Sequence, residues 1–206
     1  MAVIAVIDYD SGNVRSVCKA IEHVGSKAVL TSDRDTIFAA DGVILPGQGS
    51  FADCMEKLRR FRLIDILKRF AESGKPFLGI CVGLQLMFEK SYEFGEHEGL
   101  GIIRGSIRRF PQKKGFPVPH MGWNRVHITR KNRLFHSVDS GSYFYFVHSY
   151  FAQSDEDQIA KTDYVVEFTS AVNVDSLWGV QFHPEKSQRV GLRLLKNFCD
   201  ICEGNL

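Results

Sequence analysis

The 206-residue sequence contains no apolar run of the roughly 20 residues needed to span a lipid bilayer. The apolar N-terminal stretch, residues 2–7, is short and lacks the basic flank of a signal peptide, so we expect a buried strand there. A charge excess is also missing, because 26 Lys and Arg against 24 Asp and Glu leave a net charge of +2. This near balance argues against nucleic acid as the main partner. We therefore expect a cytoplasmic protein with no membrane and no nucleic-acid partner.

Cysteines are few and odd in number, which argues against a disulfide framework. The five are Cys18, Cys54, Cys81, Cys199 and Cys202. Cys199 and Cys202 form a CxxC pair, but there is no second pair to complete a tetrahedral metal site. Leu195 and Phe198 precede them at helical spacing, so we interpret the pair as part of an apolar helix face and expect no metal site.

The first half of the chain alternates short apolar runs with longer amphipathic segments. We expect strands at 2–7, 27–31, 42–45 and 77–80. We expect helices at 13–24, at 51–71 as one long or two joined helices, and at 82–88. Strands that alternate with helices predict a parallel sheet covered by helices on both faces.

The second half is richer in strand-like segments separated by turn signals. They cover residues 104–110, 124–129, 143–151, 163–169 and 177–182, and an amphipathic helix over 188–202 closes the chain. Residues 113–115 are expected to form an exposed loop tip. We predict one α/β domain over residues 1–206, with a central mixed, mostly parallel sheet flanked by helices and extra antiparallel strands in the C-terminal half.

The sharpest local motif surrounds Cys81. A buried strand ends at this residue, and Gly79 and Gly83 flank it in the pattern G-x-C-x-G. This is the cysteine form of a nucleophile elbow, in which small flanking residues avoid clashes at the tight turn. The start of the following helix would favour the thiolate. The alternative is an inert buried cysteine, which is a common state of free Cys.

A base for such a thiolate is available in the motif His183-Pro184-Glu185, which follows the apolar strand at 177–182. His183 would lie near the carboxyl end of a strand, where ligands bind in open α/β sheets. Glu185 is close enough in sequence to orient the imidazole by a hydrogen bond. Alone, the motif is equally consistent with a solvated turn.

Acyl transfer also requires donors to a tetrahedral oxyanion. The backbone N–H of Val82, directly after Cys81, is a natural donor. The glycine-rich segment 46–51, with Gly47 and Gly49, could present a second donor, or could be a plain β-to-α turn. It is not a nucleotide-binding Walker A loop, because no Gly-Lys-Ser/Thr follows.

Residues 117–124 and 143–151 are dense in aromatic side chains. Most are expected to pack in strands and core, although Trp, Tyr and Met are also enriched at protein interfaces. His120 and His148 lie in these segments, but no carboxylate or cysteine stands at ligand spacing beside them.

The chain resembles the class I, or triad, glutamine amidotransferases in residues 79–85 and in His183-Pro184-Glu185. Further segments make it similar to the glutaminase subunits of imidazole glycerol phosphate synthase. These are residues 8–13, 46–51, and 119–124 with 146–150. The last pair discriminates most, because the general amidotransferase motifs do not include it.

The resemblance implies that Cys81 attacks the side-chain amide of glutamine, that His183 moves protons and that Glu185 orients His183. Ammonia would pass to a (βα)8-barrel cyclase subunit of a heterodimer in histidine biosynthesis, with no cofactor. The implied oxyanion and substrate residues are Gly47, Gly49, Val82, Gln85, Ser149 and Tyr150. Those implied to face or gate the cyclase are Asn13, His120, Met121, Trp123, Asn124, Tyr145 and Lys186.

Four positions depart from the family pattern, namely Asp10, Gln48, Ser50 and Val82, and none removes a catalytic atom. Gln48 bears on the oxyanion loop, because its polar side chain could bond locally. Three alternatives remain. They are a glutaminase that feeds another synthase, such as a pyridoxal phosphate, anthranilate or purine enzyme; a non-catalytic binding subunit; and a cysteine hydrolase that needs no partner.

Overall fold

Five parallel strands form one half of the sheet in the computed structural model, which describes residues 1–154 and 156–206. They run in the order β2-β1-β3-β4-β13. Their bounds are β1 Val3–Ile7, β2 Lys27–Thr31, β3 Gly42–Leu45, β4 Phe77–Ile80 and β13 Leu177–Val180. Every residue of β3, β4 and β13 is buried, which explains why these strands are continuous apolar runs in the sequence.

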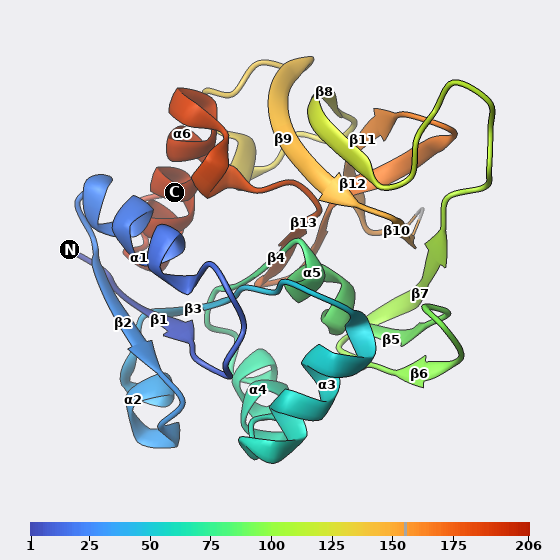
Figure 1. Cartoon of the computed structure of the whole chain (residues 1–206). Coiled ribbons are helices and arrows are strands. Elements are labelled where there is room, and N and C mark those ends of the chain that lie inside the picture. Colours follow the sequence, from blue (N-terminus) through green and yellow to red (C-terminus); the bar gives the residue numbers. More distant parts are fainter. Residues whose placement is uncertain (155) are drawn as a thin grey trace.

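Helices cover both faces of this parallel sheet. Figure 1 shows α1 and α6 on one face and α2, α3 and α4 on the other. Their bounds are α1 Val14–His23, α2 Arg34–Ala39, α3 Phe51–Arg60, α4 Ile64–Glu72, α5 Val82–Met87 and α6 Gln188–Cys202. Ser50 caps α3 by accepting the Asp53 N–H, which begins the helix directly after the glycine-rich loop. No helix in the described part of the chain is both long and apolar enough to cross a membrane.

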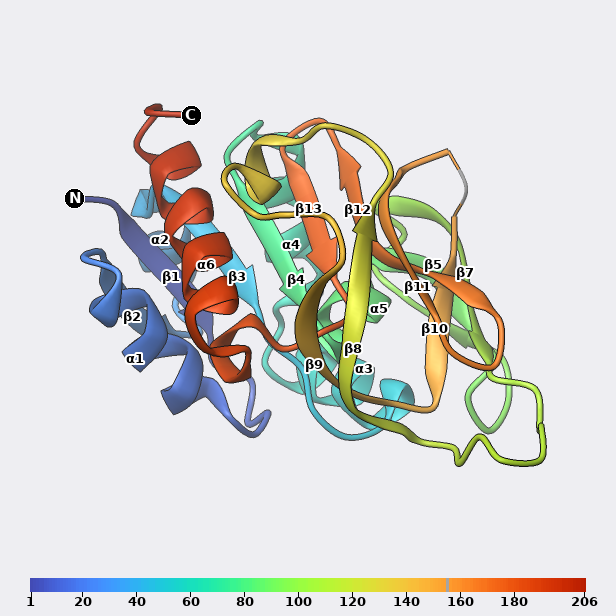
Figure 2. The same ribbon diagram turned by 90° about the horizontal axis from the view of Figure 1, so that it is seen from above.

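The sheet continues beyond β13 with mostly antiparallel strands in the order β12-β10-β7-β5-β6, of which only β5 and β7 pair in parallel. Their bounds are β5 Phe88–Ser91, β6 His97–Glu98, β7 Ile103–Arg109, β10 Tyr150–Gln153 and β12 Glu167–Val174. A branch leaves β12 through β11 (Gln158–Asp163) to β8 (His120–Ile128) and β9 (Ser142–His148). Figure 2 shows these branch strands beside the parallel part, away from both chain ends.

The predicted α/β architecture with a mixed sheet is confirmed. The segments 27–31, 42–45, 77–80 and 188–202 are predicted to the residue. Segment 51–71 forms two helices, α3 and α4, and the exposed loop tip at 113–115 is confirmed. The short elements α2, β5 and β6 were not predicted.

Two strand predictions are wrong. Segment 163–169 is not one strand, because the chain turns at residues 164–166 between β11 and β12, where the Tyr164 N–H bonds the Val166 carbonyl at 3.1 Å. This turn contains no Gly, Pro or Asn, so nothing in the sequence marks it. Segment 143–151 divides into β9 and β10 at Ser149.

Candidate active site

Cys81 occupies a sharp turn between β4 and α5. Its φ of 56° and ψ of −113° are strained for a residue with a Cβ, and its N–H bonds the Val180 carbonyl at 2.8 Å. The flanking glycines are required, because a Cβ on Gly83 would collide with the Leu45 carbonyl and one on Gly79 would lie 2.8 Å from the Leu84 nitrogen. The strand–turn–helix context of a nucleophile elbow is therefore present, with the thiol at the N-terminus of a helix.

Sheet pairing brings the other site segments to Cys81. β4 lies between β3 and β13, with Leu45 opposite Gly79 and Val180 opposite Ile80. Because all three strands are parallel, their carboxyl ends meet at one edge of the sheet. The glycine-rich loop after β3 and the segment after β13 therefore flank Cys81 on its two sides.

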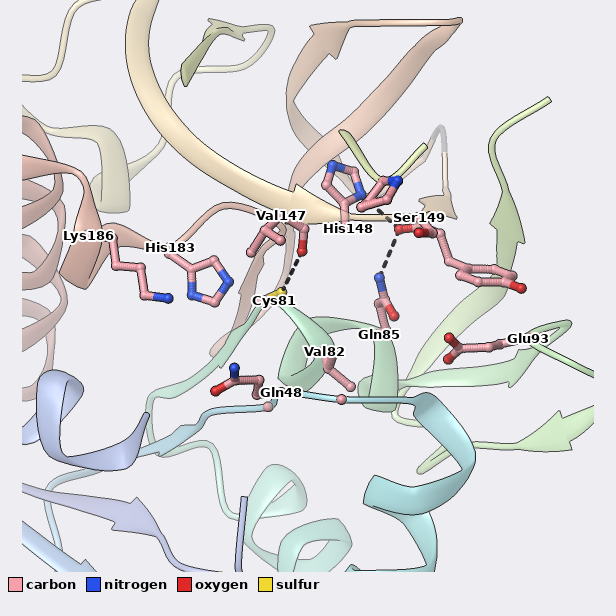
Figure 3. A pocket seen from close by; sticks show the side chains of 14 residues that line it. Gln48, Cys81, Val82, Gln85, Glu93, Val147, His148, Ser149, His183 and Lys186 are labelled. Atoms are coloured by element: carbon pink, nitrogen blue, oxygen red, sulfur yellow. Dashed lines mark hydrogen bonds between the residues drawn. The ribbon is translucent and has the colours of Figure 1, made fainter. Parts of the chain in front are cut away.

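His183 is held in one orientation by Glu185. Its Nδ1 lies 2.8 Å from Glu185 Oε1, and the Asn13 amide donates to the same oxygen at 2.7 Å. A carboxylate only accepts, so Nδ1 carries the proton and Nε2 is free for the thiol. Nε2 is buried without a hydrogen-bond partner among the described residues, and Figure 3 shows the ring directed toward Cys81.

The surroundings of His183 favour its charged form. Burial lowers the pKa of the imidazole, but the negative charge of a Cys81 thiolate and the hydrogen bond to Glu185 outweigh burial and raise that pKa to about 10. A charged imidazole beside a cysteine is the arrangement that activates a cysteine nucleophile.

A cavity of about 250 Å³ opens above Cys81 and His183. All six residues predicted to form the oxyanion and substrate site line it, namely Gly47, Gly49, Val82, Gln85, Ser149 and Tyr150. The Gln85 amide donates to the Tyr150 carbonyl at 2.9 Å and to Gln181 Oε1 at 3.0 Å. Gln85 therefore fastens α5 to the start of β10 across the floor of the cavity.

Glu93 is a pocket residue that the sequence analysis did not single out. It is the only acidic side chain among the described residues that line the cavity, and Figure 3 shows its carboxylate directed inward. The Phe51 N–H donates to Glu93 Oε2 at 2.6 Å, and burial raises the pKa of the carboxyl. In sequence Glu93 resembles any acid of a polar loop, so no signal distinguishes it.

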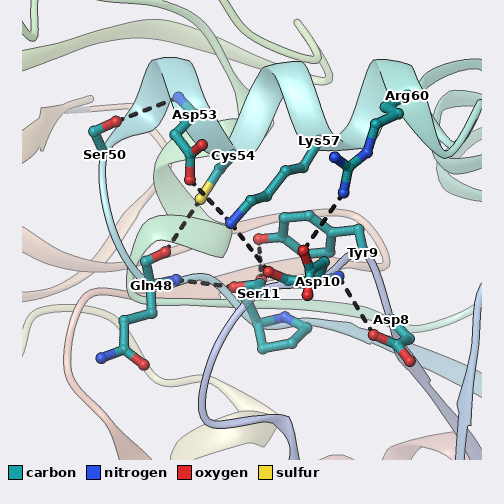
Figure 4. A network of polar contacts seen from close by, with 11 residues as sticks. Asp8, Tyr9, Asp10, Ser11, Gln48, Ser50, Asp53, Cys54, Lys57 and Arg60 are labelled. Atoms are coloured by element: carbon teal, nitrogen blue, oxygen red, sulfur yellow. Dashed lines mark hydrogen bonds and ion pairs between the residues drawn. The ribbon is translucent and has the colours of Figure 1, made fainter.

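The glycine-rich loop is held from its far side. The Gln48 N–H donates to Ser11 Oγ at 3.1 Å, and the Cys54 thiol donates to the Gln48 carbonyl at 3.4 Å (Figure 4). The Tyr9 hydroxyl donates to the Pro46 carbonyl at 2.6 Å. The Val82 N–H lies at the start of α5, where an N–H has no partner within the helix, whereas the Gln48 N–H is bonded to Ser11.

Asp10 belongs to the same network. Its φ of 64° lies in the left-handed region, which glycine adopts without the strain that a Cβ causes. Lys57 donates to the Asp10 carbonyl at 3.0 Å, and Arg60 lies 3.4 Å from the Asp10 carboxylate. Helix α3 thus holds the first loop, which in turn holds the glycine-rich loop.

The residues predicted to meet a partner occupy two layers. Met121 and Trp123 on β8 are 63% and 46% exposed, and Lys186 lies 5.9 Å above the ring of the half-buried Tyr145. His120 is buried and Asn124 bonds to it, so both lie behind this exposed surface. The Asn13 amide bonds Glu185, a contact that the sequence analysis did not predict.

Cys199 and Cys202 are free thiols on α6. Cys199 is buried together with Leu195 and Phe198, and burial raises the pKa of its thiol to about 11. Burial also raises the pKa of Cys202. Raised thiol pKa values oppose redox reactivity, which supports the interpretation of this pair as part of an apolar helix face.

Comparison with known proteins agrees with this geometry. Residues 5–202 match the family model "Glutamine amidotransferase class-I". Among solved structures, PurLQS from Thermotoga maritima superposes with a TM-score of 0.75 at 18% identity, covering 98% of this chain and 99% of that one. A GMP synthase subunit from Thermoplasma acidophilum superposes with a TM-score of 0.73 at 20% identity, covering 99% and 95%. The chain belongs to the class I glutamine amidotransferases.

Closer relatives define the branch of that class. The imidazole glycerol phosphate synthase subunit HisH of Syntrophotalea carbinolica is 48% identical over 97% of this chain and 100% of its own length. HisH of Aquifex aeolicus is 46% identical over 94% of each chain. The chain therefore belongs to the HisH family, the glutaminase subunits of imidazole glycerol phosphate synthase.

Proposed function

We propose that Cys81, His183 and Glu185 hydrolyse glutamine by nucleophilic catalysis. The Cys81 thiolate attacks the side-chain amide carbon, and the Val82 N–H stabilises the oxyanion. Imidazolium at His183 gives its Nε2 proton to the amide nitrogen, which leaves as ammonia. Water, deprotonated by the same nitrogen, then opens the glutamyl thioester to give glutamate and the free thiol. The observation that carries this proposal is the Nδ1–Glu185 bond of 2.8 Å, which leaves Nε2 to the thiol.

Glu93 is proposed to receive the α-ammonium group of the substrate. Its half-buried carboxyl has a raised pKa, so a cation beside it would stabilise the ionised form. Gln85, Gly49 and the Ser149–Tyr150 backbone line the same cavity and are proposed to hold the rest of the amino-acid end. This orientation directs the side-chain amide toward Cys81.

Glu93→Gln is expected to raise KM for glutamine about 10- to 100-fold, because the substrate loses the binding free energy of one charge-assisted hydrogen bond. The kcat should change much less, because Glu93 lies away from the reacting amide. Steady-state glutamate release measures both constants. Glu96→Gln, an exposed acid paired with Lys90, is the matched control and should behave as the wild type. An unchanged KM in Glu93→Gln would remove Glu93 from the substrate site.

We further propose that ammonia passes to a (βα)8-barrel cyclase docked on the outer face of β8 and β9. Met121, Trp123 and Tyr143 are large exposed apolar side chains on these two strands. Pro119 and Lys186, at the edge of this surface, also line the cavity. The exposed aromatic surface and the mouth of the pocket thus lie together, which would let ammonia leave directly toward the partner.

The loop network supports activation by that partner. While Ser11 accepts the Gln48 N–H, this N–H is not available to the cavity as a second oxyanion donor. Glutamate release by the purified chain is therefore expected to be low and to rise on addition of the cyclase with its ribonucleotide ligand. Trp123→Ala should raise the cyclase concentration needed for half-maximal activation about 30-fold, the loss of an interface anchor.

Leu30→Ala is the matched control for Trp123→Ala, because Leu30 is exposed on β2 at the opposite edge of the sheet. It should leave the activation curve unchanged. Full activity of the chain alone would argue against activation by docking. Equal activation curves for Trp123→Ala and the wild type would place the partner elsewhere.

A cytoplasmic location is also proposed. All five cysteines are free thiols, the state maintained in reducing compartments. The biosynthetic function of the HisH family agrees with this location.

A further inference from the structure

A chain of buried hydrogen bonds runs from β8 to the wall of the cavity. The Asn124 amide nitrogen lies 3.2 Å from His120 Nε2, and His120 Nδ1 lies 3.0 Å from His148 Nε2. His148 Nδ1 lies 2.8 Å from the Tyr150 carbonyl, which also accepts the Gln85 amide. The family resemblance implied a place at the partner interface for His120 and no role for His148, and the catalytic mechanism above uses neither ring.

In this series of hydrogen bonds, the position of every proton is determined by its partners. The Tyr150 carbonyl only accepts, so His148 carries its proton on Nδ1 and presents a bare Nε2. His120 must then donate from Nδ1 and accept at Nε2 from the Asn124 amide. That amide is fixed in turn, because its nitrogen also donates to the Asp163 carbonyl and its oxygen accepts the Arg125 N–H.

This series of hydrogen bonds requires the imidazole rings of His120 and His148 to be neutral, and their surroundings favour the neutral form. Both histidines are buried, and burial lowers the pKa of His120 to about 4 and that of His148 to about 3. The His120 ring is stacked between Phe146 and Tyr164, with centroids 4.9 and 4.0 Å away. Packing therefore prevents the ring from turning to another hydrogen-bond arrangement.

The two ends of this series of hydrogen bonds lie at different functional surfaces. On β8, His120 and Asn124 alternate with Met121 and Trp123, so the two pairs face opposite sides of one strand. At the other end, His148, Ser149 and Tyr150 line the cavity, and the Val147 carbonyl lies 3.9 Å from Cys81 Sγ. A shift of β8 would therefore be passed to the segment that lies over the nucleophile.

We propose that His120 and His148 are positioning residues that hold the segment 147–150 over Cys81 and couple it to the partner-facing strand β8. The inference rests on the proposed function. The hydrogen bonds, rather than the packing of the rings, carry the coupling. A matched pair of variants at His120 separates these two contributions.

His120→Phe retains an aromatic ring between Phe146 and Tyr164 but removes the donor to His148. His120→Asn retains an amide donor at the place of Nδ1 but loses the stacked ring. Steady-state glutamate release, with and without the purified cyclase and its ribonucleotide ligand, is measured for both. His120→Phe is expected to raise KM for glutamine and to reduce the activation by cyclase, each about 10-fold, since it leaves a buried acceptor unpaired. His120→Asn should stay nearer the wild type.

The opposite order, with His120→Asn more impaired than His120→Phe, would show that His120 acts only by packing and would overturn the proposal. Wild-type behaviour of His120→Phe would overturn it as well. His127→Phe, on the same strand but outside the hydrogen-bond chain, is the control for added aromatic bulk.

A spectroscopic measurement on the wild-type protein is independent of glutaminase activity and of the folding of any variant. Nitrogen NMR of histidine-labelled protein at pH 7 should show His120 and His148 both neutral and both protonated on Nδ1. Protonation of either ring on Nε2, or a cationic ring, would overturn the inference. An absence of glutaminase activity in the wild type with cyclase would instead refute the proposed function and leave this assignment standing.

Discussion

Cys81→Ala is expected to lower glutamine-dependent turnover by at least about 10⁴-fold, the effect of removing the nucleophile from a triad. The substitution removes one buried sulfur and leaves the rest of the pocket unchanged. Because Cys81 lies inside the cavity and not on the exposed surface of β8, cyclase binding should remain. Glutamate release and calorimetric titration with the cyclase measure the two properties in one preparation.

Cys18→Ala is the matched control, since Cys18 lies part-exposed on α1. It should retain wild-type turnover. Substantial glutaminase activity in Cys81→Ala would mean that another group attacks the substrate, and the triad assignment would be wrong.

Glu185→Gln is expected to lower kcat about 10²- to 10⁴-fold, as for the loss of the orienting acid in other triads. The carboxylate accepts from both His183 Nδ1 and the Asn13 amide, and its charge helps to raise the pKa of His183. A neutral amide removes that charge and can donate an N–H to Nδ1. The neutral imidazole would then carry its proton on Nε2, the wrong nitrogen for accepting a proton from the thiol or water. KM for glutamine should change little, because Glu185 does not line the cavity.

Glu72→Gln, an exposed acid on α4, is the control for this substitution. A kcat within a few-fold of the wild type in Glu185→Gln would show that Asn13 and the backbone orient His183 without the carboxylate.

The parallel half of the fold was predictable because its strands are buried on both faces. Residues 42–45 and 77–80 are apolar throughout, and turn residues or charged helices bound them. The antiparallel half was harder, because its β-branched and aromatic residues continue through turns such as 164–166 and through the division at Ser149. The local sequence pattern does not indicate where such a segment turns, because pairing with strands distant in the sequence determines the position of the turn.

The site shows the same division between local and long-range information. The Cys81 elbow and the His183–Glu185 spacing are local motifs, and both could be recognised from sequence. The contact between Asn13 and Glu185 joins residues 172 positions apart. Glu93 enters the cavity only because of how the polar loop after β5 packs against the start of α3. Such contacts depend on the assembled fold and leave no periodic signal in the chain.

The most direct test of the central claim, that Cys81 attacks the glutamine side chain, is covalent labelling with a glutamine analogue whose amide is replaced by a chloromethyl ketone. The protein is treated in the presence of the cyclase, with and without excess glutamine, and its peptides are mapped by mass spectrometry. The predicted result is one adduct, on Cys81, that glutamine suppresses. An adduct on Cys18, Cys54, Cys199 or Cys202 in place of Cys81, or labelling that glutamine does not suppress, would contradict the account.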